Sequence, residues 1–226
     1  MIVTIHQPEH MVWLGLLDKI SKADLFVIFD DTQFKKHYFE NRNKIRTQDG
    51  WMWLTVPVKN QPLDTNIKDI EISYDREWQK KYLNAIRTNY SKAPYFNDYF
   101  PKIEETINKN HKYLIDLNME ILLFFFSAFG INKKMIKASE LGISKDICGS
   151  DLCLVICQKA GAKTYLAGVS GKDYLNIPSF KDCKIDVVPH EFDHPAYKQQ
   201  YEPFIPGMSA IDALFNLGPE AKKLIS

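Results

Sequence analysis

The sequence predicts an α/β fold: one domain over residues 1–226, with a doubly wound, mostly parallel sheet and a helical insertion at about residues 76–130. Short apolar runs that end in polar clusters and then lead into helical segments are typical of such sheets. One run, LFVIFD at Leu25 to Asp30, is almost continuously apolar, as expected for a strand buried on both faces. The 226 residues, of which 45% are hydrophobic, suffice for one sizeable core.

The first third of the chain is expected to begin with a compact βαβ unit. Its elements are a strand at Ile2–Ile5, a helix at Leu14–Ala23 and a strand at Leu25–Asp30. The polar and aromatic segment from Asp30 to Arg46 is expected to be a loop that displays its side chains. An Asp-Gly turn at Asp49 then introduces a strand at Trp51–Val58.

The middle of the chain has helical periodicity, and alternation of strands and helices returns in the last third. The expected helices of the middle region are Arg76–Thr88, Tyr99–Asn108 and Tyr113–Phe129. The expected elements of the last third are a strand at Met135–Lys137, a helix at Ser150–Ala160, strands at Thr164–Gly168 and Cys183–Pro189, and a helix at Ser209–Leu217. Ser209 and Gly218 are suited to begin and end that last helix.

The composition argues against several classes of protein. A formal net charge of +1 argues against bulk capture of nucleic acid. The longest apolar run, Ile121 to Phe129, is about half of the roughly 20 residues that a bilayer crossing needs, so no membrane partner is expected. No secretory signal is recognised and none of the four cysteines forms a CxxC pair, so we expect reduced thiols, a cytoplasmic location and no metal site.

Polar clusters are expected to converge at the carboxyl ends of the strands. The first is His6 and Gln7, which follow the first strand directly, where Pro8 stops the strand from continuing. The side chain of histidine titrates near neutrality, so His6 could act as a general base or hold a phosphate. A lone histidine within a turn is the alternative interpretation.

The second cluster, Asp30, Asp31 and Gln33, follows the second strand. Adjacent residues of an extended stretch point to opposite sides, so only one of the two aspartates can face a given ligand. Two carboxylates alone are weak evidence for magnesium, and no metal is assigned to them.

The third cluster comprises Lys35, Lys36, Asn41, Arg42, Asn43 and Arg46, which lie among aromatic residues. A solvated basic loop is one interpretation. The other is a site for an anionic ligand, because arginine grips phosphate with two parallel hydrogen bonds and aromatic rings stack on sugars or bases. The nearly neutral chain favours a small phosphorylated ligand over nucleic acid.

The fourth cluster lies in GVSGKDYLN, from Gly168 to Asn176, and contains Ser170, Gly171, Lys172 and Tyr174. Its glycines would let the backbone approach a ligand closely, and amides in such a turn can hold a phosphate or an oxyanion. A simple tight turn is the alternative, and the pattern differs from a P-loop.

His194 comes later, before Pro195, in a segment expected to be an extended crossing. We expect it to contact substrate or to have a structural role.

Several of these segments resemble the WbqC-like family. The resemblance rests on HQPEHMVWLGLLDKISKADLFVIFDDTQFKKHYFENRNKI, WLTVPV, TYLAGVSGKDYLN and SAIDALFNLGPEA, which follow in order along nearly the whole chain. It implies transfer of a glycyl or other acyl group onto the amino group of a nucleotide-linked amino sugar, in the synthesis of O-antigen and other surface polysaccharides. The implied partners are a nucleotide sugar and an acyl donor such as an acyl carrier protein or a coenzyme A thioester. No cofactor is assigned.

A second likeness concerns architecture. A strand, a loop with a histidine, a helix and a strand in this order resemble pantothenate synthetase and other nucleotidyltransferase-like, Rossmann-like proteins. Their HxGH signature is absent, because Trp13, Leu14 and Gly15 stand where its second histidine is expected. The likeness therefore supports only the doubly wound sheet.

We therefore predict an N-acyltransferase in which His6 is the base, Asp30 or Asp31 orients it or the amine, and Ser170 with neighbouring amides steadies an oxyanion. The residues expected to bind the substrate are Gln7, Gln33, Lys36, Asn41, Arg42, Asn43, Gly171, Lys172, Tyr174 and His194. The alternatives are a nucleotidyltransferase or ATP-dependent ligase, and a non-catalytic module that binds nucleotide sugars.

Overall fold

A computed structural model describes residues 1–225, and within them a five-stranded parallel sheet has the order β5-β2-β1-β6-β7. The strands are β1 (Ile2–His6), β2 (Leu25–Ile28), β5 (Lys134–Lys137), β6 (Thr164–Ala167) and β7 (Asp186–Pro189). Each strand runs parallel to its neighbours. The predicted α/β fold with a doubly wound sheet is therefore confirmed.

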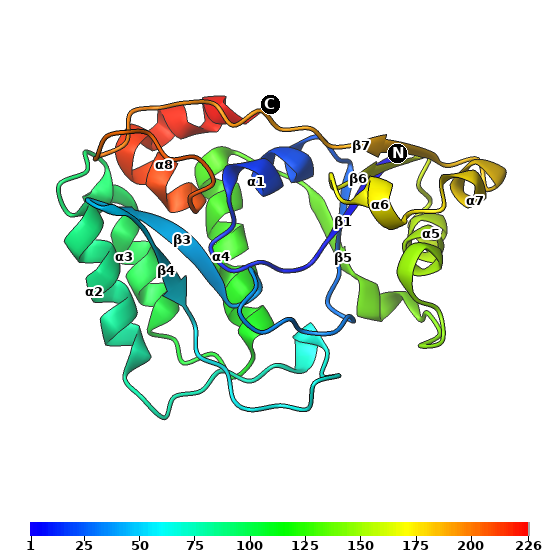
Figure 1. The fold of residues 1–226 in the computed structure, drawn as a ribbon, viewed down its shortest axis with the longest axis horizontal. Coiled ribbons are helices and arrows are strands. Elements are labelled where there is room, and N and C mark those ends of the chain that lie inside the picture. The colour runs from blue at the N-terminus through cyan, green and yellow to red at the C-terminus, as the bar shows by residue number, and fades with distance from the viewer. Residues whose placement is uncertain (226) are drawn as a thin grey trace.

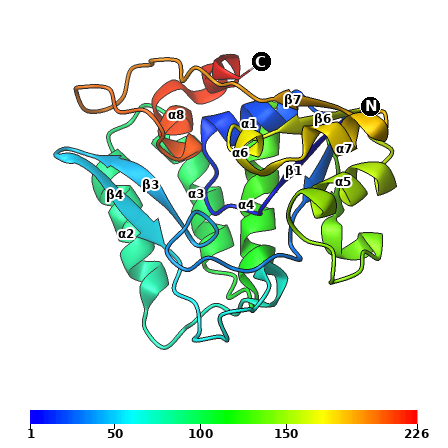
Figure 2. The ribbon, with the colours of Figure 1, turned by 45° about the vertical axis from the view of Figure 1, so that its right-hand side comes forward.

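Helices cover both faces of the sheet, which explains the apolar run at β2 (Figures 1 and 2). Phe26 and Ile28 belong to a core that includes α1 (Leu14–Ser21) and the helices of the middle region. Leu25 and Val27 point the other way, into a second core beneath α5 (Gly149–Lys159) and α7 (Ile177–Asp182). Because successive side chains of a strand alternate between faces, both sets must be apolar.

The direction of winding reverses between β1 and β6. From β1 the chain moves to β2 and then to β5 on one side, whereas β6 and β7 lie on the other side. The carboxyl ends of β1 and β6 therefore diverge into loops that run to opposite faces, which opens a crevice at this switch point.

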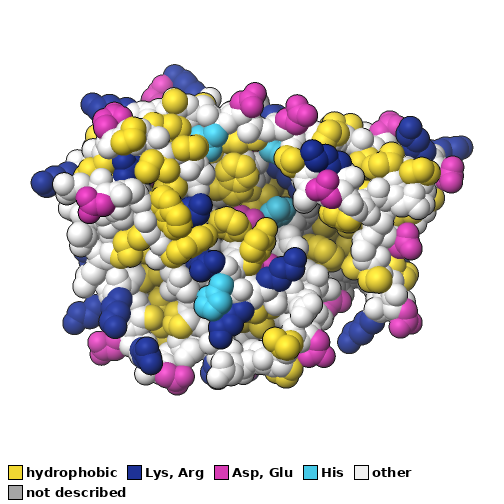
Figure 3. Space-filling model, viewed as in Figure 1, with side chains coloured by type: hydrophobic (Ala, Val, Ile, Leu, Met, Phe, Trp, Pro, Cys, Tyr) yellow, Lys and Arg dark blue, Asp and Glu magenta, His cyan; other side chains and the backbone are white. Residues whose placement is uncertain are grey.

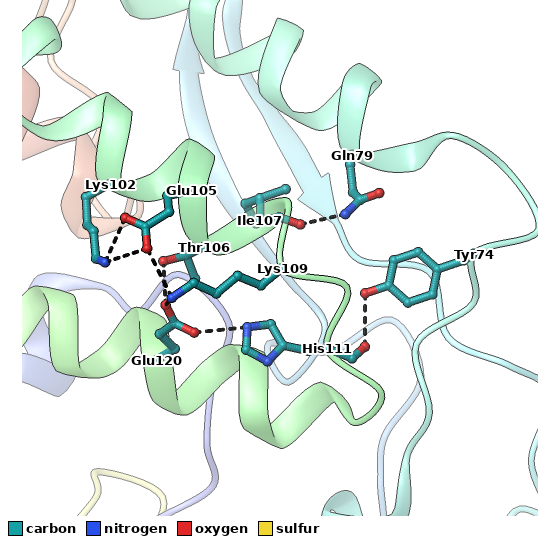
Figure 4. A network of polar contacts seen from close by, with 9 residues as sticks. All are labelled: Tyr74, Gln79, Lys102, Glu105, Thr106, Ile107, Lys109, His111 and Glu120. Atoms are coloured by element: carbon teal, nitrogen blue, oxygen red, sulfur yellow. Dashed lines mark hydrogen bonds and ion pairs between the residues drawn. The ribbon is translucent and has the colours of Figure 1, made fainter.

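Three long helices fall within residues 76–130: α2 (Trp78–Tyr90), α3 (Phe96–Ile107) and α4 (Leu114–Phe129). Their apolar faces join the same core as α1 and β2. A polar network ties the end of α3 to α4 (Figure 4). In it, Lys109 bridges Glu105 and Glu120 at 3.2 and 2.6 Å, and His111 Nε2 lies 3.0 Å from Glu120 Oε2.

The segment expected to be a displayed loop contains a strand instead. β3 (Arg42–Thr47) pairs with β4 (Gly50–Thr55) in an antiparallel hairpin around the predicted turn at Asp49. Ile45 is fully buried and Asn43 lies on the same face, also buried. The strand was missed because its inward face carries an asparagine, which disguises the alternation of polar and apolar residues.

The last third contains α6 (Gly171–Tyr174), α7 and α8 (Ala210–Leu217). Ser209 caps α8 by accepting a hydrogen bond from the Ile211 N–H, as its residue type predicts. Short 3₁₀ turns lie at Ile67–Asp69, Ala138–Leu141 and Gly218–Leu224. In the part of the chain that the structure describes, no helix is long and apolar enough to cross a membrane.

Candidate active site

A cavity of about 580 Å³ lies at the carboxyl ends of β1 and β6, and we call it the β1–β6 crevice. The loop after β1 contributes His6, Gln7 and Glu9, and the loop after β6 contributes Gly168, Ser170 and Tyr174. The other lining residues include Lys19, Lys35, Tyr38, Cys148 and Cys153. Figure 3 shows one face of the molecule hollowed near its middle, with histidine side chains and side chains of lysine or arginine in and around the hollow.

His6 and Glu9 form a hydrogen-bonded pair in the crevice. His6 is the last residue of β1, and its Nε2 lies 2.9 Å from Oε1 of Glu9. His6 is 26% exposed, whereas Glu9 is 9% exposed, so the histidine faces the open side of the pair. An ionised carboxylate only accepts hydrogen bonds, so Nε2 carries the proton and Nδ1 is left as the basic nitrogen.

A buried histidine holds the loop that carries this pair. Asn118 donates through Nδ2 to the carbonyls of Pro8 and Glu40, so its Oδ1 faces His10 as an acceptor. His10 therefore donates from Nδ1 to Asn118 at 2.9 Å and accepts at Nε2 from the Tyr82 hydroxyl at 2.7 Å. Burial lowers the pKa of His10 to about 4, which keeps this anchor neutral.

Lys19 reaches the crevice from α1. Its side chain is 3% exposed, and Nζ donates to the carbonyl oxygen of Ile5 at 3.0 Å. A Cβ placed on Gly168 would lie 3.8 Å from this ammonium, so the lysine adjoins the β6 loop. Burial lowers the pKa of Lys19 to about 8, while the charge of Glu9 opposes the shift.

Glu40 adds a second acid near Glu9. It is 2% exposed, and burial, reinforced by the charge of Glu9, raises its pKa to about 7. Within residues 1–225, neither Glu40 Oε2 nor Glu9 Oε2 has a hydrogen-bond partner. The crevice thus combines a paired histidine, an incompletely bonded carboxylate and a buried ammonium.

The profile of the WbqC-like protein family matches residues 7–224. The chain belongs to this family. It is also similar to the "Uncharacterized protein Rv1507c" of Mycobacterium tuberculosis (strain ATCC 25618 / H37Rv), with 31% identity over 222 residues, 97% of this chain and 95% of that protein. No solved structure matches the chain. The resemblance inferred from the sequence motifs is confirmed.

In this WbqC-like chain the two aspartates lie apart from His6. Asp30 is buried, and its carboxylate accepts from the Ser139 N–H at 3.0 Å and the Ser139 hydroxyl at 2.6 Å. Asp31 pairs with Lys68 at 2.8 Å and lines an adjoining hollow of about 320 Å³. Asp30 thus anchors the segment after β5, and the carboxylate beside His6 is Glu9.

The Asn-Arg-Asn tract of the WbqC-like chain does not line the crevice. Asn41 and Asn43 are buried, and their amides donate to the carbonyls of Val56, His10 and Met11. Asn41 precedes β3 and Asn43 lies on it, and their side chains fix neighbouring backbone segments by hydrogen bonds. The guanidinium of Arg42 lies 4.0 Å from the centre of the Trp53 ring.

Other predicted contacts of the WbqC-like chain are also placed elsewhere. Gln33 donates to the carbonyl of Leu63 at 2.6 Å, and Lys36 lines two different hollows, although its neighbour Lys35 does line the crevice. His194 packs among aromatic rings, which include Phe192, Tyr197 and Phe204.

The fourth predicted cluster of the WbqC-like chain, from Gly168 to Asn176, contributes only some of its residues to the lining of the crevice. Ser170 and Tyr174 line the crevice, whereas Gly171 and Lys172 do not. A Cβ on Gly171 would meet the Ala167 Cβ at 3.0 Å and the Leu175 Cδ1 at 3.1 Å. This glycine therefore lets α6 pack closely against the end of β6.

Glu9, Lys19 and Glu40 are the residues that sequence reasoning missed. Glu9 stands in the turn that ends the first strand, and Lys19 stands within an apolar helix pattern, so the local sequence singles out neither residue. The sequence does contain a signal for Lys19, which lies on the inner side of the predicted first helix. A lysine buried there must face a polar cavity or an acidic side chain. In the described part of the chain, no group of three or more His, Cys, Asp or Glu residues is placed to hold a metal ion.

Proposed function

We propose that the β1–β6 crevice is the active site of an N-acyltransferase that acts on a nucleotide-linked amino sugar for surface polysaccharide synthesis. The observation that carries the proposal is the His6–Glu9 pair beside the buried Lys19, at the switch point of a parallel sheet. Such switch points are where open α/β sheets bind ligands. Membership of the WbqC-like family supports the choice of substrate class.

In the proposed reaction the amine of the sugar attacks the carbonyl carbon of an acyl thioester, carried by coenzyme A or by an acyl carrier protein. A C–N bond forms, the C–S bond breaks, and the thiolate leaves. His6 takes the proton of the attacking amine at Nδ1 and passes it to the leaving sulfur. Glu9 holds the ring by its bond to Nε2 and stabilises the imidazolium that forms.

Lys19 supplies a buried positive charge to the site. With a pKa of about 8 its ammonium is largely protonated at neutral pH, and the surrounding protein screens it far less than water would. We assign it to the developing oxyanion, together with the amides of the turn at Gly168 and Ser170. Sequence reasoning placed that role on the turn alone.

The proposal is tested by incubating the purified chain with nucleotide-linked amino sugars and acyl or glycyl thioesters, and by following the product by mass spectrometry. The expected result is an amide product that gains the mass of the acyl group, with release of one thiol per amide. Binding of the sugar nucleotide without product under all donors would support a binding module instead. Magnesium-dependent release of pyrophosphate from ATP would favour the ligase alternative.

A further inference from the structure

A second hollow lies between β4 and α2, and we call it the β4–α2 hollow. Its volume is about 720 Å³, and none of the residues that line it also lines the β1–β6 crevice. One wall is formed by four successive residues of β4, Met52 to Thr55, and the other by α2 and the segment before it. Within the described chain β4 pairs only with β3, so its second edge borders the hollow without a partner strand.

Aromatic side chains line this hollow. Trp53 comes from β4, and Trp78 and Tyr82 come from α2, where their rings meet edge to face at 5.7 Å. Trp78 is 7% exposed, and its indole N–H has no hydrogen-bond partner among residues 1–225. A buried donor without an acceptor is costly, and a turn of the Trp78 side chain would bring this nitrogen, which has almost no accessible surface of its own, to an acceptor in the hollow. The Tyr82 hydroxyl, in contrast, is bonded to His10.

The hollow is also rich in positive charge. Lys36, Arg76 and Lys81 line it, and no carboxylate in the described residues forms an ion pair with any of them. The one acidic residue in the lining, Asp75, accepts from the Ser73 hydroxyl at 2.8 Å. Three unpaired cations around aromatic walls suit a ligand that joins a flat ring to an anion.

From these observations we infer that the β4–α2 hollow binds a nucleoside phosphate. The base packs against the aromatic walls, and on binding the Trp78 ring turns so that its N–H donates to a carbonyl or ring-nitrogen acceptor of the base. The phosphate lies toward Lys36, Arg76 and Lys81. This inference does not depend on the activity proposed for the β1–β6 crevice.

Isothermal titration calorimetry with UMP and AMP as probes tests the inference, with uridine, inorganic phosphate and a neutral disaccharide as comparison ligands. We expect a nucleotide to bind more tightly than uridine or inorganic phosphate, because only the nucleotide engages both the rings and the cations. We expect Trp78→Phe, which keeps the ring and removes the donor, to weaken binding about fivefold to tenfold. Lys81→Met is expected to weaken it by a similar factor and to reduce its dependence on salt.

Matched controls use neighbours outside the hollow. Lys80→Met alters the adjacent lysine, which borders a different depression, and Trp51→Phe alters a tryptophan that is not part of the lining. Both are expected to bind as the unaltered chain does. Circular dichroism of each variant verifies that the fold is kept.

Three results would overturn the inference. One is the absence of nucleotide binding at millimolar concentration, and another is binding of the neutral disaccharide in preference to nucleotides. The third is nucleotide binding that survives both Trp78→Phe and Lys81→Met but disappears in His6→Ala, which would place the nucleotide in the β1–β6 crevice. Failure of the acyl-transfer assay would leave the calorimetric result unaffected.

Discussion

The ammonium of Lys19 lies 3.0 Å from the carbonyl oxygen of Ile5, so a charge from α1 is held beneath the end of the first strand. Burial disfavours the charged form of the side chain and therefore lowers the pKa of Lys19. Charged groups held at such a cost are found disproportionately at functional sites.

Lys19→Met is expected to lower turnover by about a hundredfold, since removal of one oxyanion donor has effects of this size. The same change should raise the free energy of unfolding at pH 7 by on the order of 2 kcal/mol. At pH 7 the lysine is protonated in both the folded and the unfolded chain, so the folded state is destabilised by the full free energy of burying the ammonium. As the pH rises from about 8 to 10.5, Lys19 loses its proton in the folded chain before it does so in the unfolded chain, and the destabilisation caused by the buried charge disappears. The difference in free energy of unfolding between Lys19→Met and the unaltered chain should therefore shrink over this range. Urea unfolding at several pH values measures this, and an unchanged stability difference at pH 10 would contradict it.

His6→Ala is expected to reduce acyl transfer by on the order of a hundredfold or more, because a general base typically contributes that much. His37→Asn is a matched control, since His37 is exposed, does not line the crevice, and has a positive φ that asparagine tolerates. Initial rates of product formation compare the two variants. Turnover of His6→Ala within about threefold of the unaltered enzyme would remove His6 from the mechanism.

Glu9→Gln is expected to lower kcat by about tenfold to a hundredfold with little change in KM. The amide keeps the shape of the side chain but loses the charge that stabilises the imidazolium on His6. The pH dependence of kcat distinguishes this from a structural effect, because the acidic limb, along which protonation of the general base removes activity, should move to lower pH when the carboxylate is lost. A change in KM alone would indicate that Glu9 contacts the substrate.

Glu40→Gln is expected to stabilise the chain above pH 7 by on the order of 2 kcal/mol. The raised pKa of Glu40 means that the folded state binds more protons than the unfolded state between about pH 4.5 and 7. Stability therefore falls as the pH rises through that window, and the full cost is present above it. Thermal unfolding at pH 5 and pH 8 should show the benefit of glutamine only at the higher pH. An equal benefit at both values would show that Glu40 does not titrate in this range.

His10 is expected to act in the opposite direction. Its lowered pKa means that the unfolded state binds the extra proton between pH 6.5 and about 4, so stability falls as the pH falls through this window. His10→Gln should lose on the order of 2 kcal/mol at pH 7, because the bonds to Asn118 and Tyr82 are disturbed. In His10→Gln the free energy of unfolding should also lose the part of its decrease at low pH that His10 causes. His37→Asn should retain that decrease. Urea titrations from pH 4 to 8 give both values.

Local patterns predicted most of the elements. Most elements lie within a few residues of the expected ranges, because the apolar periodicity of each is contained in its own consecutive residues. These elements are the strands β1, β2, β5 and β6 and the helices α1, α4, α5 and α8. The position of His6 at the end of the first strand follows from the same local signal. β3 was missed because the amide of Asn43 is satisfied by the distant carbonyls of His10 and Met11.

Short-range patterning and motif order suffice to predict the α/β class, the family and the place of His6. The three-dimensional arrangement of the strands shows that Glu9 rather than an aspartate partners His6, and that Lys19 lies next to Gly168 across the crevice. The physical reason is that β1 and β6 are adjacent in the sheet although about 160 residues separate them. Which charges share one cavity depends on strand order and on burial, and neither is encoded in the spacing of neighbouring residues.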